Sequence, residues 1–261
     1  MRESVNQLAM IRRKLALTAS SERLPARKRI ATGHEGLDAA LHGGLARGRV
    51  HELFAAEPDD GPNAAGLAAM LALRASGCGS PILWLRSDEA GRRGGGLHAP
   101  GMVELGGDPN RLVLGQAPDA KTLLRSAGDA ARCPGLQALI VECWGKCPEL
   151  DLTASRRLAL AAEQSGVTLL LLRLGAEPVP SAADTRWSIS AAPSCVLEAN
   201  APGPPMFELE LLRRRAGPSG MRWRLEWDRD QIIFREPAHP GAVVSLPAGR
   251  PVAADPWRLS A

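Results

Sequence analysis

Residues 32–54 decide the fold, and they read TGHEGLDAALHGGLARGRVHELF. The first half predicts a turn and a short helix, the pair Gly43-Gly44 predicts a second turn, and the residues up to Phe54 predict a strand. In nucleotide-binding α/β proteins this layout leads directly into a loop that holds phosphate groups. We therefore expect an α/β domain in which the strand ending at Phe54 is followed by the position of such a loop.

The loop at that position has lost the residues that bind phosphate. A phosphate-binding loop has the form G-x-x-x-x-G-K-[ST]: its glycines let backbone N–H groups surround the phosphates, its lysine reaches the terminal ones, and its hydroxyl holds Mg²⁺. Residues 55–64 read AAEPDDGPNA, without lysine, serine or threonine, and Asp59 and Asp60 would repel phosphate. We expect no catalytic residue, no bound cofactor and no metal ion here, with residual ATP binding as the alternative. The residues that mark the degenerate loop are Ala55, Ala56, Gly61, Pro62 and Asn63.

A second segment comes one residue short of the same pattern. Residues 115–122, GQAPDAKT, lie between a predicted strand and a predicted helix. Ala120 stands where the pattern needs its second glycine, and a Cβ there obstructs the approach of phosphate to the backbone. Asp119 has the wrong charge for a phosphate site and is well placed to cap the helix that follows. We interpret this segment as the capped start of a helix.

Acidic residues follow two of the predicted core strands. Asp88 and Glu89 follow the strand at 82–85, where an ATPase of this layout carries the glutamate that activates water. Glu142 ends the strand at 136–141, where such enzymes usually place an aspartate that organises Mg²⁺. Without a phosphate cradle these acids have nothing to catalyse, so we expect relict or structural roles for them.

The composition fits one large α/β domain in a reducing compartment. The 261 residues are 45% hydrophobic, enough for a full core, and the net charge of +4 permits contact with nucleic acid without requiring it. No apolar run reaches the ~18–20 residues that span a bilayer, and the first residues lack the apolar region of a signal peptide. We therefore expect a cytoplasmic protein without membrane contact. The odd number of cysteines indicates no disulfide framework, and Cys143 and Cys147 lack the partners of a zinc site.

The chain divides into an arm with a basic linker at 1–29, a core at 30–236 and a Pro-rich tail at 237–261. In the core, near-continuous apolar strands alternate with helices, which predicts a mostly parallel sheet covered by helices on both faces. Residues 206–213 and 221–228 flank a turn and predict an antiparallel hairpin.

The arm carries apolar residues at helical spacing and a basic cluster beside them, which predicts an amphipathic helix. Such a helix suits docking on a partner or on a neighbouring protomer. Alternatively, it covers an edge of its own domain. Its apolar residues are Val5, Leu8, Ile11 and Leu15.

Arginines cluster at three places in the core. Residues 91–96, GRRGGG, predict a flexible basic loop, a triplet lies at the hairpin, and two more arginines flank a proline-containing loop at 174–185. Arginine forks suit phosphate groups, although a solvated charged surface is the ordinary alternative at each place. No pattern predicts base readout, so any DNA binding would be non-specific and salt-sensitive. The candidate DNA contacts are Arg92, Arg93, Arg173, Arg186, Arg213, Arg214 and Arg215.

Together these segments resemble the ImuA family, RecA-like proteins of the bacterial damage-induced mutagenesis cassette. The resemblance begins in residues 32–54, which follow the opening pattern of RecA, and His51-Glu52 is the histidine–glutamate pair typical of the ImuA family. It continues in the same order over roughly residues 30–230, and the ordered set carries it rather than any single motif. The later segments are 84–85, 111–114, 138–142, 158–162, 185–189 and 224–227.

The resemblance implies a RecA-like α/β core: a mostly parallel central sheet with helices on both faces, a C-terminal antiparallel hairpin extension and an N-terminal helical arm. It also implies an accessory role in SOS-induced, error-prone translesion DNA synthesis. The implied partners are RecA, ImuB and a DnaE-type error-prone polymerase, with single-stranded DNA as a further, non-specific one.

The sequence departs from RecA at the phosphate loop, so we expect a protein that is not an enzyme. Two alternatives stay open. One is a RecA-like ATPase with an atypical nucleotide site. The other is a SulA-like inhibitor of cell division, because that family is likewise RecA-shaped and lacks a phosphate loop.

Overall fold

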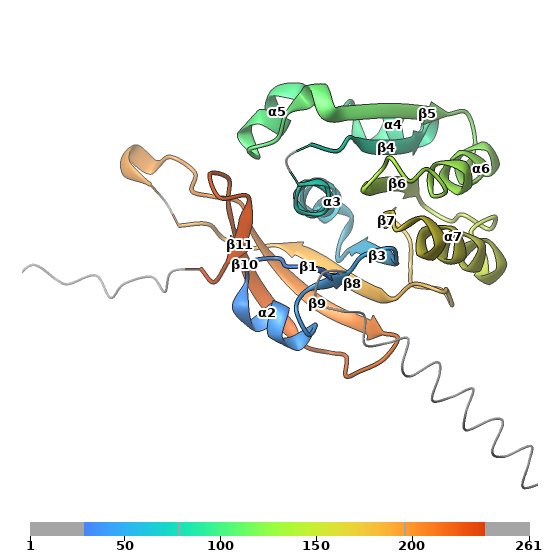
Figure 1. Cartoon of the computed structure of the whole chain (residues 1–261). Coiled ribbons are helices and arrows are strands. Elements are labelled where there is room, and N and C mark those ends of the chain that lie inside the picture. Colours follow the sequence, from blue (N-terminus) through green and yellow to red (C-terminus); the bar gives the residue numbers. More distant parts are fainter. Residues whose placement is uncertain (1–28, 78, 196, 238–261) are drawn as a thin grey trace, which may run out of the picture.

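The computed structural model describes residues 29–77, 79–195 and 197–237 (Figure 1). These residues form a nine-stranded sheet with helices on both faces and a separate pair of short strands. The predicted arm helix, with Val5, Leu8, Ile11 and Leu15, and the Pro-rich tail from residue 238 onward lie outside the described residues.

Six parallel strands form the larger part of the sheet. Their bounds are β3 (Val50–Ala55), β4 (Ile82–Ser87), β5 (Leu112–Ala117), β6 (Ala138–Trp144), β7 (Thr168–Leu174) and β8 (Thr185–Ala191). In space they follow the order β8, β3, β7, β6, β4, β5. β7 is buried along its whole length and β6 along all but its last residue, which explains their near-continuous apolar sequence. The predicted mostly parallel sheet is confirmed.

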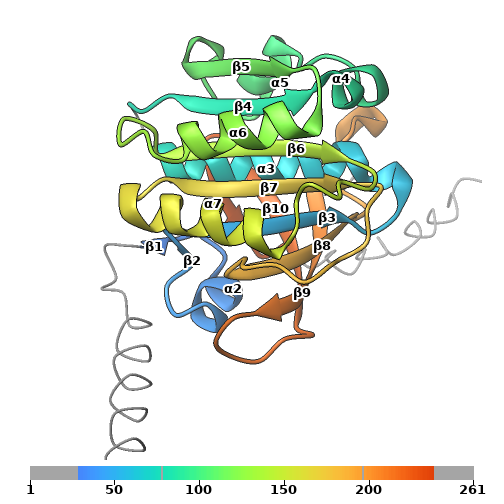
Figure 2. The same ribbon diagram turned by 90° about the vertical axis from the view of Figure 1, so that its right-hand side faces the viewer.

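Helices cover both faces of these strands. Their bounds are α2 (Glu35–Ala40), α3 (Gly61–Ser76), α4 (Asp88–Gly94), α5 (Ala99–Glu104), α6 (Ala120–Ala130) and α7 (Leu152–Ser165), with 3₁₀ turns η2 (Pro58–Asp60), η3 (Pro109–Arg111) and η4 (Glu198–Asn200). α6 and α7 lie side by side on one face, and α3 lies on the other (Figures 1 and 2). Of the 16 residues of α3, 11 are buried, so this alanine-rich helix is the centre of the larger hydrophobic core.

Three antiparallel strands continue the sheet beyond β8 and curve beneath α3 in Figure 1. They are β9 (Met206–Arg214), β10 (Arg222–Asp228) and β11 (Ile233–Arg235). β9 and β10 form the predicted hairpin. Charged residues alternate with apolar ones along β10, and two of the charged residues, Glu226 and Asp228, are buried. Both carboxylates pair with Arg235 of β11, each at 3.1 Å, and this pairing offsets the cost of their burial.

The opening stretch folds as its sequence predicts. The ring of His34 accepts a hydrogen bond from the backbone N–H of Leu37 and thereby caps α2. Gly43 and Gly44 both adopt positive φ, at 106° and 105°, in the turn that follows. Beyond this turn β2 (Leu45–Ala46) pairs with β1 (Arg29–Ile30), and the chain then enters β3. Residues 32–49 therefore lead directly into β3, which is the central strand of the sheet.

One local prediction is wrong. Residues 91–96 were expected to form a flexible loop, but most of them belong to the end of α4. Ser87 caps this helix by accepting a hydrogen bond from the backbone N–H of Ala90, and Glu89 pairs with arginines three and four residues later. The buried guanidinium of Arg86 also donates to the carbonyls of Ala90 and Gly95, so tertiary contacts add to the cap in holding a helix that contains glycines. The helix ends at Gly94, and Gly95 has a positive φ of 70°.

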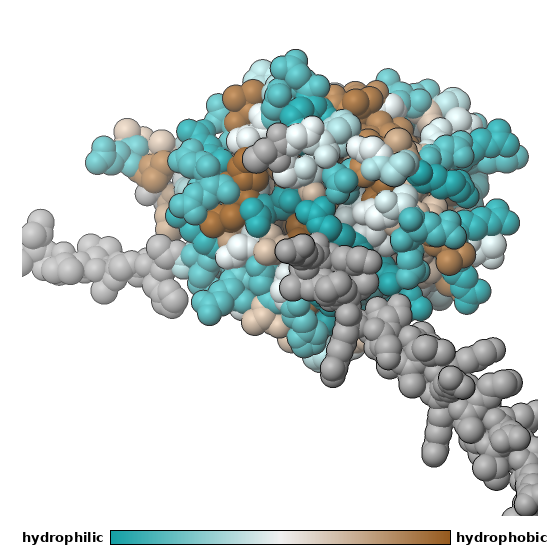
Figure 3. Space-filling model, viewed as in Figure 1, coloured by the Kyte–Doolittle hydropathy of each residue, from teal (hydrophilic) through white to brown (hydrophobic). Residues whose placement is uncertain are grey.

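Hydrophobic residues on the face seen in Figure 3 occur as small groups between hydrophilic ones. The larger exposed apolar side chains lie on several different elements, such as Val113 on β5 and Leu160 on α7. Within the described ranges, none of the helices combines the length and the apolarity needed to cross a membrane.

Candidate functional site

The connection between β3 and α3 stands where the sequence predicts a degenerate phosphate loop. Of the residues that mark the degenerate loop, Ala55 ends β3, Ala56 precedes the 3₁₀ turn η2, and Gly61, Pro62 and Asn63 form the start of α3. A helix N-terminus binds anions through its free backbone N–H groups. Here the second residue of α3 is a proline, which removes one of those donors.

The carboxylate of Asp60 fastens this connection to the neighbouring strand. Its Oδ1 accepts a hydrogen bond from the backbone N–H of Ala191 at the end of β8, at 2.8 Å. Its Oδ2 accepts from the backbone N–H of Glu57, at 3.3 Å. Glu57 and Asp59 are exposed in the same connection, which therefore carries three carboxylates. Their negative charge opposes the binding of a polyphosphate.

Glu142, at the end of β6, is buried in a closed set of hydrogen bonds. Its carboxylate pairs with the buried guanidinium of Arg86 on β4, at 2.9 Å. The indole N–H groups of Trp84 and Trp144 donate to its two oxygens, at 2.9 and 3.0 Å. Arg86 also donates to backbone carbonyls at the two ends of α4. Glu142 thus holds β4, β6 and α4 together.

Trp144 extends this set of contacts to the start of α3. A Cβ built on Gly61 would lie 3.9 Å from the ring of Trp144, and one built on Gly94 would lie 3.5 Å from it. The indole therefore lies between the N-terminus of α3 and the C-terminus of α4. Trp144 thus packs beside the first residue of α3, next to the position to which the frame leads.

The pair His51-Glu52 has structural contacts on opposite faces of the sheet, as adjacent residues of a strand must. His51 is fully buried; one ring nitrogen lies 2.7 Å from the hydroxyl of Thr185 and the other 2.9 Å from the carbonyl of Ala46. Burial lowers the pKa of His51, so the ring is neutral and donates to that carbonyl. Glu52 accepts from Nε of Arg186 on β8, at 2.8 Å, in a buried ion pair.

The near-match to a phosphate loop at 115–122 is the start of a helix. β5 ends at Ala117, and the side chain of Asp119 accepts a hydrogen bond from the backbone N–H of Thr122, at 2.7 Å. That hydrogen bond lowers the pKa of Asp119. The predicted cap of α6 is confirmed. Within the described ranges, no cluster of three histidine, cysteine or acidic side chains could hold a metal ion.

Two of the candidate DNA contacts are buried. Arg173 on β7 and Arg186 on β8 are 3% and 8% exposed, and both guanidinium groups lie 5.7 Å from the ring centre of Phe54. Arg186 is neutralised by Glu52. The prediction that these two residues reach DNA from a loop is wrong, because sheet register turns both side chains into the interior.

The remaining candidates lie at or near the surface. Arg92 and Arg93 on α4 are exposed, and both pair with Glu89. These hydrogen bonds lower the pKa of Glu89. Arg214 donates to the backbone carbonyl of Ala40, at 2.8 Å. Because these three cations already have partners, a polyanion would compete with existing contacts.

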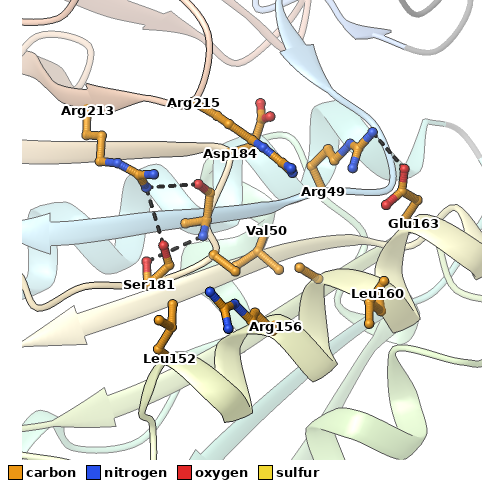
Figure 4. Close-up of a pocket in the computed structure, with 13 residues that line it drawn as sticks. Arg49, Val50, Leu152, Arg156, Leu160, Glu163, Ser181, Asp184, Arg213 and Arg215 are labelled. Carbon is orange, nitrogen blue, oxygen red and sulfur yellow. Dashed lines mark hydrogen bonds and ion pairs between the residues drawn. The ribbon is translucent and has the colours of Figure 1, made fainter. Parts of the chain in front are cut away.

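Arg213 and Arg215 line a cleft with a volume of about 390 Å³ (Figure 4). The cleft lies between α7, the start of β3 and residues 181–184. Arg49 lines it and pairs with Glu163 at 2.9 Å. Arg156 of α7 reaches it from the other side, and Asp184 adds one carboxylate. Four arginines against two acids make the cleft a basic surface.

No sequence pattern predicts that Arg49 and Arg156 lie beside the hairpin arginines Arg213 and Arg215. They are far apart in the chain, and the short arginine pairs to which they belong, 47/49 and 156/157, do not by themselves indicate a shared surface. The register of β3 beside β8 and the position of α7 bring them together. The role of Trp144 was likewise missed, because nothing near it in the sequence marks a contact with α3.

Known proteins include sequence relatives of this chain and a solved structure with a similar fold. The chain is 33% identical over 200 residues to Protein ImuA from two strains of Caulobacter vibrioides, NA1000 / CB15N and ATCC 19089 / CIP 103742 / CB 15. The match covers 72% of this chain and 72% of each relative. No protein-family model matches the sequence.

The crystal structure of the RadB recombinase superposes with a TM-score of 0.54 at 15% identity. The match covers 80% of this chain and all of the RadB chain. This likeness concerns the fold, and it confirms the predicted RecA-like core.

Proposed function

The chain belongs to the ImuA family, and we propose that it acts in the cytoplasm as a non-catalytic accessory protein of SOS-induced, error-prone translesion DNA synthesis. In this proposal the RecA-like core serves as a surface for protein contacts. Its partners are RecA and ImuB, and it helps bring a DnaE-type error-prone polymerase to a lesion. Single-stranded DNA is a further, non-specific ligand.

The observation that supports a non-catalytic role is the set of contacts that the protein makes with itself at the phosphate-loop position. Asp60 fastens the loop, Trp144 lies over the start of α3, and the oxygens of Glu142 accept from Arg86 and two indoles. An acid engaged in this way is not free to organise Mg²⁺, and binding of a triphosphate would require several of these contacts to break. The proposed role therefore depends on shape and surface rather than on turnover.

Titration of the full chain with ATP and Mg²⁺ tests this role. We expect no saturable heat, corresponding to a dissociation constant weaker than about 1 mM. A RecA protein measured in the same buffer supplies the positive control. Tight, saturable heat would instead favour the alternative of an ATPase with an atypical site.

The arm is proposed to carry part of the contact with protein partners. Removing residues 1–20 is expected to weaken capture of purified RecA or ImuB by about tenfold, or 1.4 kcal/mol. The melting temperature of the core should be unchanged, and a variant lacking residues 238–261 is the matched control. Unchanged capture by the truncated chain would overturn the role of the arm.

Binding of the division GTPase in place of RecA and ImuB would favour the SulA-like alternative. Light scattering of the polymerising GTPase gives a direct comparison. We expect the full chain to leave that polymerisation unchanged.

The cleft in Figure 4 is the proposed contact for single-stranded DNA. Reversing the charge of Arg156 and Arg215 together is expected to weaken binding of a labelled oligo-dT about tenfold, measured by fluorescence anisotropy. The slope of log K against log salt should also become shallower, by roughly 0.7 for each lost phosphate contact. Arg157→Glu is the control, because Arg157 is exposed on the same helix but lines a different groove. An equal loss of affinity in both variants would show that DNA binding depends on the net charge of the protein and not on the cleft.

A further inference from the structure

Arg173 is a buried cation that lacks a carboxylate partner among the described residues. It is 3% exposed, and its Nε and one terminal nitrogen, Nη1, have no hydrogen-bond partner there. The neighbouring acid, Glu52, is already paired with Arg186. An uncompensated buried charge is strongly destabilising. The position of Arg173 therefore favours a negative charge nearby.

Two thiols lie beside this guanidinium. Cys143 on β6 stands directly opposite Arg173 on β7 and is 3% exposed. The chain turns at Gly145, whose φ is 66° and whose N–H donates to the carbonyl of Leu174 at 2.7 Å. This turn brings Cys147 back against the hydrophobic cluster that contains Cys143. The thiol of Cys147 also donates to a carboxylate oxygen of Glu149, at 3.8 Å.

The surroundings make the two thiols unequal. The hydrogen bond from Cys143, the backbone N–H of Leu150 and the charge of Arg173 lower the pKa of Cys147 to about 7, against the opposing effects of burial and of Glu149. The same hydrogen bond and burial raise the pKa of Cys143, and Glu142 adds to the rise. Cys147 is half-buried and accessible, and the thiolate is the reactive form of a cysteine.

We propose that Cys143 and Cys147 form a hydroperoxide-sensitive thiol pair beside Arg173, with Cys147 as the attacking thiolate and Cys143 as the resolving thiol. The sulfur of Cys147 attacks one oxygen of the hydroperoxide and the O–O bond breaks. The sulfur becomes a sulfenic acid, and the departing alkoxide takes a proton from solvent. Cys143 then loses its proton to solvent and attacks this sulfur, so that an S–S bond forms and hydroxide leaves as water. In total two thiols are oxidised by two electrons and one hydroperoxide is reduced to an alcohol and water.

The disulfide would join the end of β6 to the loop that leads into α7. That loop runs from residue 145 to 151 and contributes the cap of α7, because Asp151 accepts from the backbone N–H of Ala154. α7 supplies Leu152 and Arg156 to the cleft of Figure 4. The oxidised loop would thus directly precede the helix that forms one wall of the cleft. This inference does not depend on the proposed function.

Peptide mapping of the reduced, full-length chain after treatment with hydrogen peroxide tests the proposal. We expect a peptide pair linked through Cys143 and Cys147, reversible by dithiothreitol, before Cys133 or Cys195, the exposed thiols among the described residues, is oxidised. Those two exposed cysteines are internal controls in the same sample. Oxidation of Cys133 or Cys195 at the same rate, without the linked pair, would overturn the proposal.

Two core variants, Cys143→Ser and Arg173→Gln, assign the roles, and Cys133→Ser is the control. Cys143→Ser should stop the reaction at the sulfenic acid of Cys147, which dimedone traps, whereas Cys133→Ser should leave formation of the linked pair unchanged. Arg173→Gln should slow alkylation of Cys147 by iodoacetamide at least threefold at pH 7. If either core variant fails to fold, the pH dependence of Cys147 alkylation in the unmodified chain still decides. A midpoint near 7 supports the pair, and a midpoint above 8.5 contradicts it.

Discussion

Replacing Glu142 with alanine is expected to lower the free energy of unfolding by about 3–5 kcal/mol, because the change removes one partner of a buried ion pair. The guanidinium of Arg86 would remain in the interior without its carboxylate, and the indole N–H groups of Trp84 and Trp144 would lose their acceptor. Urea denaturation followed by circular dichroism gives the value. In an active ATPase an acid at this position organises Mg²⁺ for catalysis. Here we expect the loss of Glu142 to lower the free energy of unfolding instead.

The matched control for Glu142 is Glu89→Ala. Glu89 also pairs with arginines, but its pairs lie on the surface of α4, where solvent screens them. Its removal should leave the denaturation midpoint nearly unchanged. A second test replaces Arg86 and Glu142 together by apolar residues, which should recover much of the loss. A loss below about 1 kcal/mol for Glu142→Ala would contradict the structural role assigned to it.

Gly44→Ala is expected to lower the free energy of unfolding by more than about 3 kcal/mol. Gly44 has a φ of 105°, a conformation that costs other residues about 1–3 kcal/mol. In addition, a Cβ there would overlap the backbone carbonyl of Ile30 on β1. Relieving this overlap requires β1 to separate from β2, so the opening frame would be lost with the turn.

Gly43→Ala distinguishes the overlap from the conformational cost. Gly43 has nearly the same φ, 106°, but the nearest atom to its Cβ would be the Cδ of Arg29 at 3.5 Å, which is ordinary contact. This variant should lose about 1–2 kcal/mol. Equal losses at the two positions in thermal or urea denaturation would show that the close approach of β1 contributes nothing.

The sequence predicts the architecture well because its signals are local. The opening frame, the apolar strands β6 and β7, the hairpin and the cap at Asp119 depend on residues that are close together in the chain. The end of α4 was mistaken for a loop because four of the six residues in 91–96 are glycine. Capping by Ser87 and the pairs of Glu89 are weaker sequence signals than glycine, although together they hold the helix.

The candidate site is less predictable because it depends on register between strands. Arg173 and Arg186 flank a polar loop in the sequence and look like surface cations. Their burial requires that β7 and β8 lie on either side of β3, with Phe54 and Glu52 between them. The same holds for Glu142, whose partner Arg86 is 56 residues away in the chain. Local sequence patterns do not indicate which strands will be neighbours in the sheet.

The packing of Trp144 beside the start of α3 has a consequence for how long the protein stays bound to a partner. Proteins with a nucleotide cycle leave their partners after an interval set by hydrolysis. Under the proposed function this protein does not bind nucleotide, so hydrolysis does not limit the lifetime of its complexes. Its presence on a partner is then governed by mass action, through its concentration and its dissociation constant. In that case the dose of the protein in the cell, rather than a turnover rate, determines how long a complex persists.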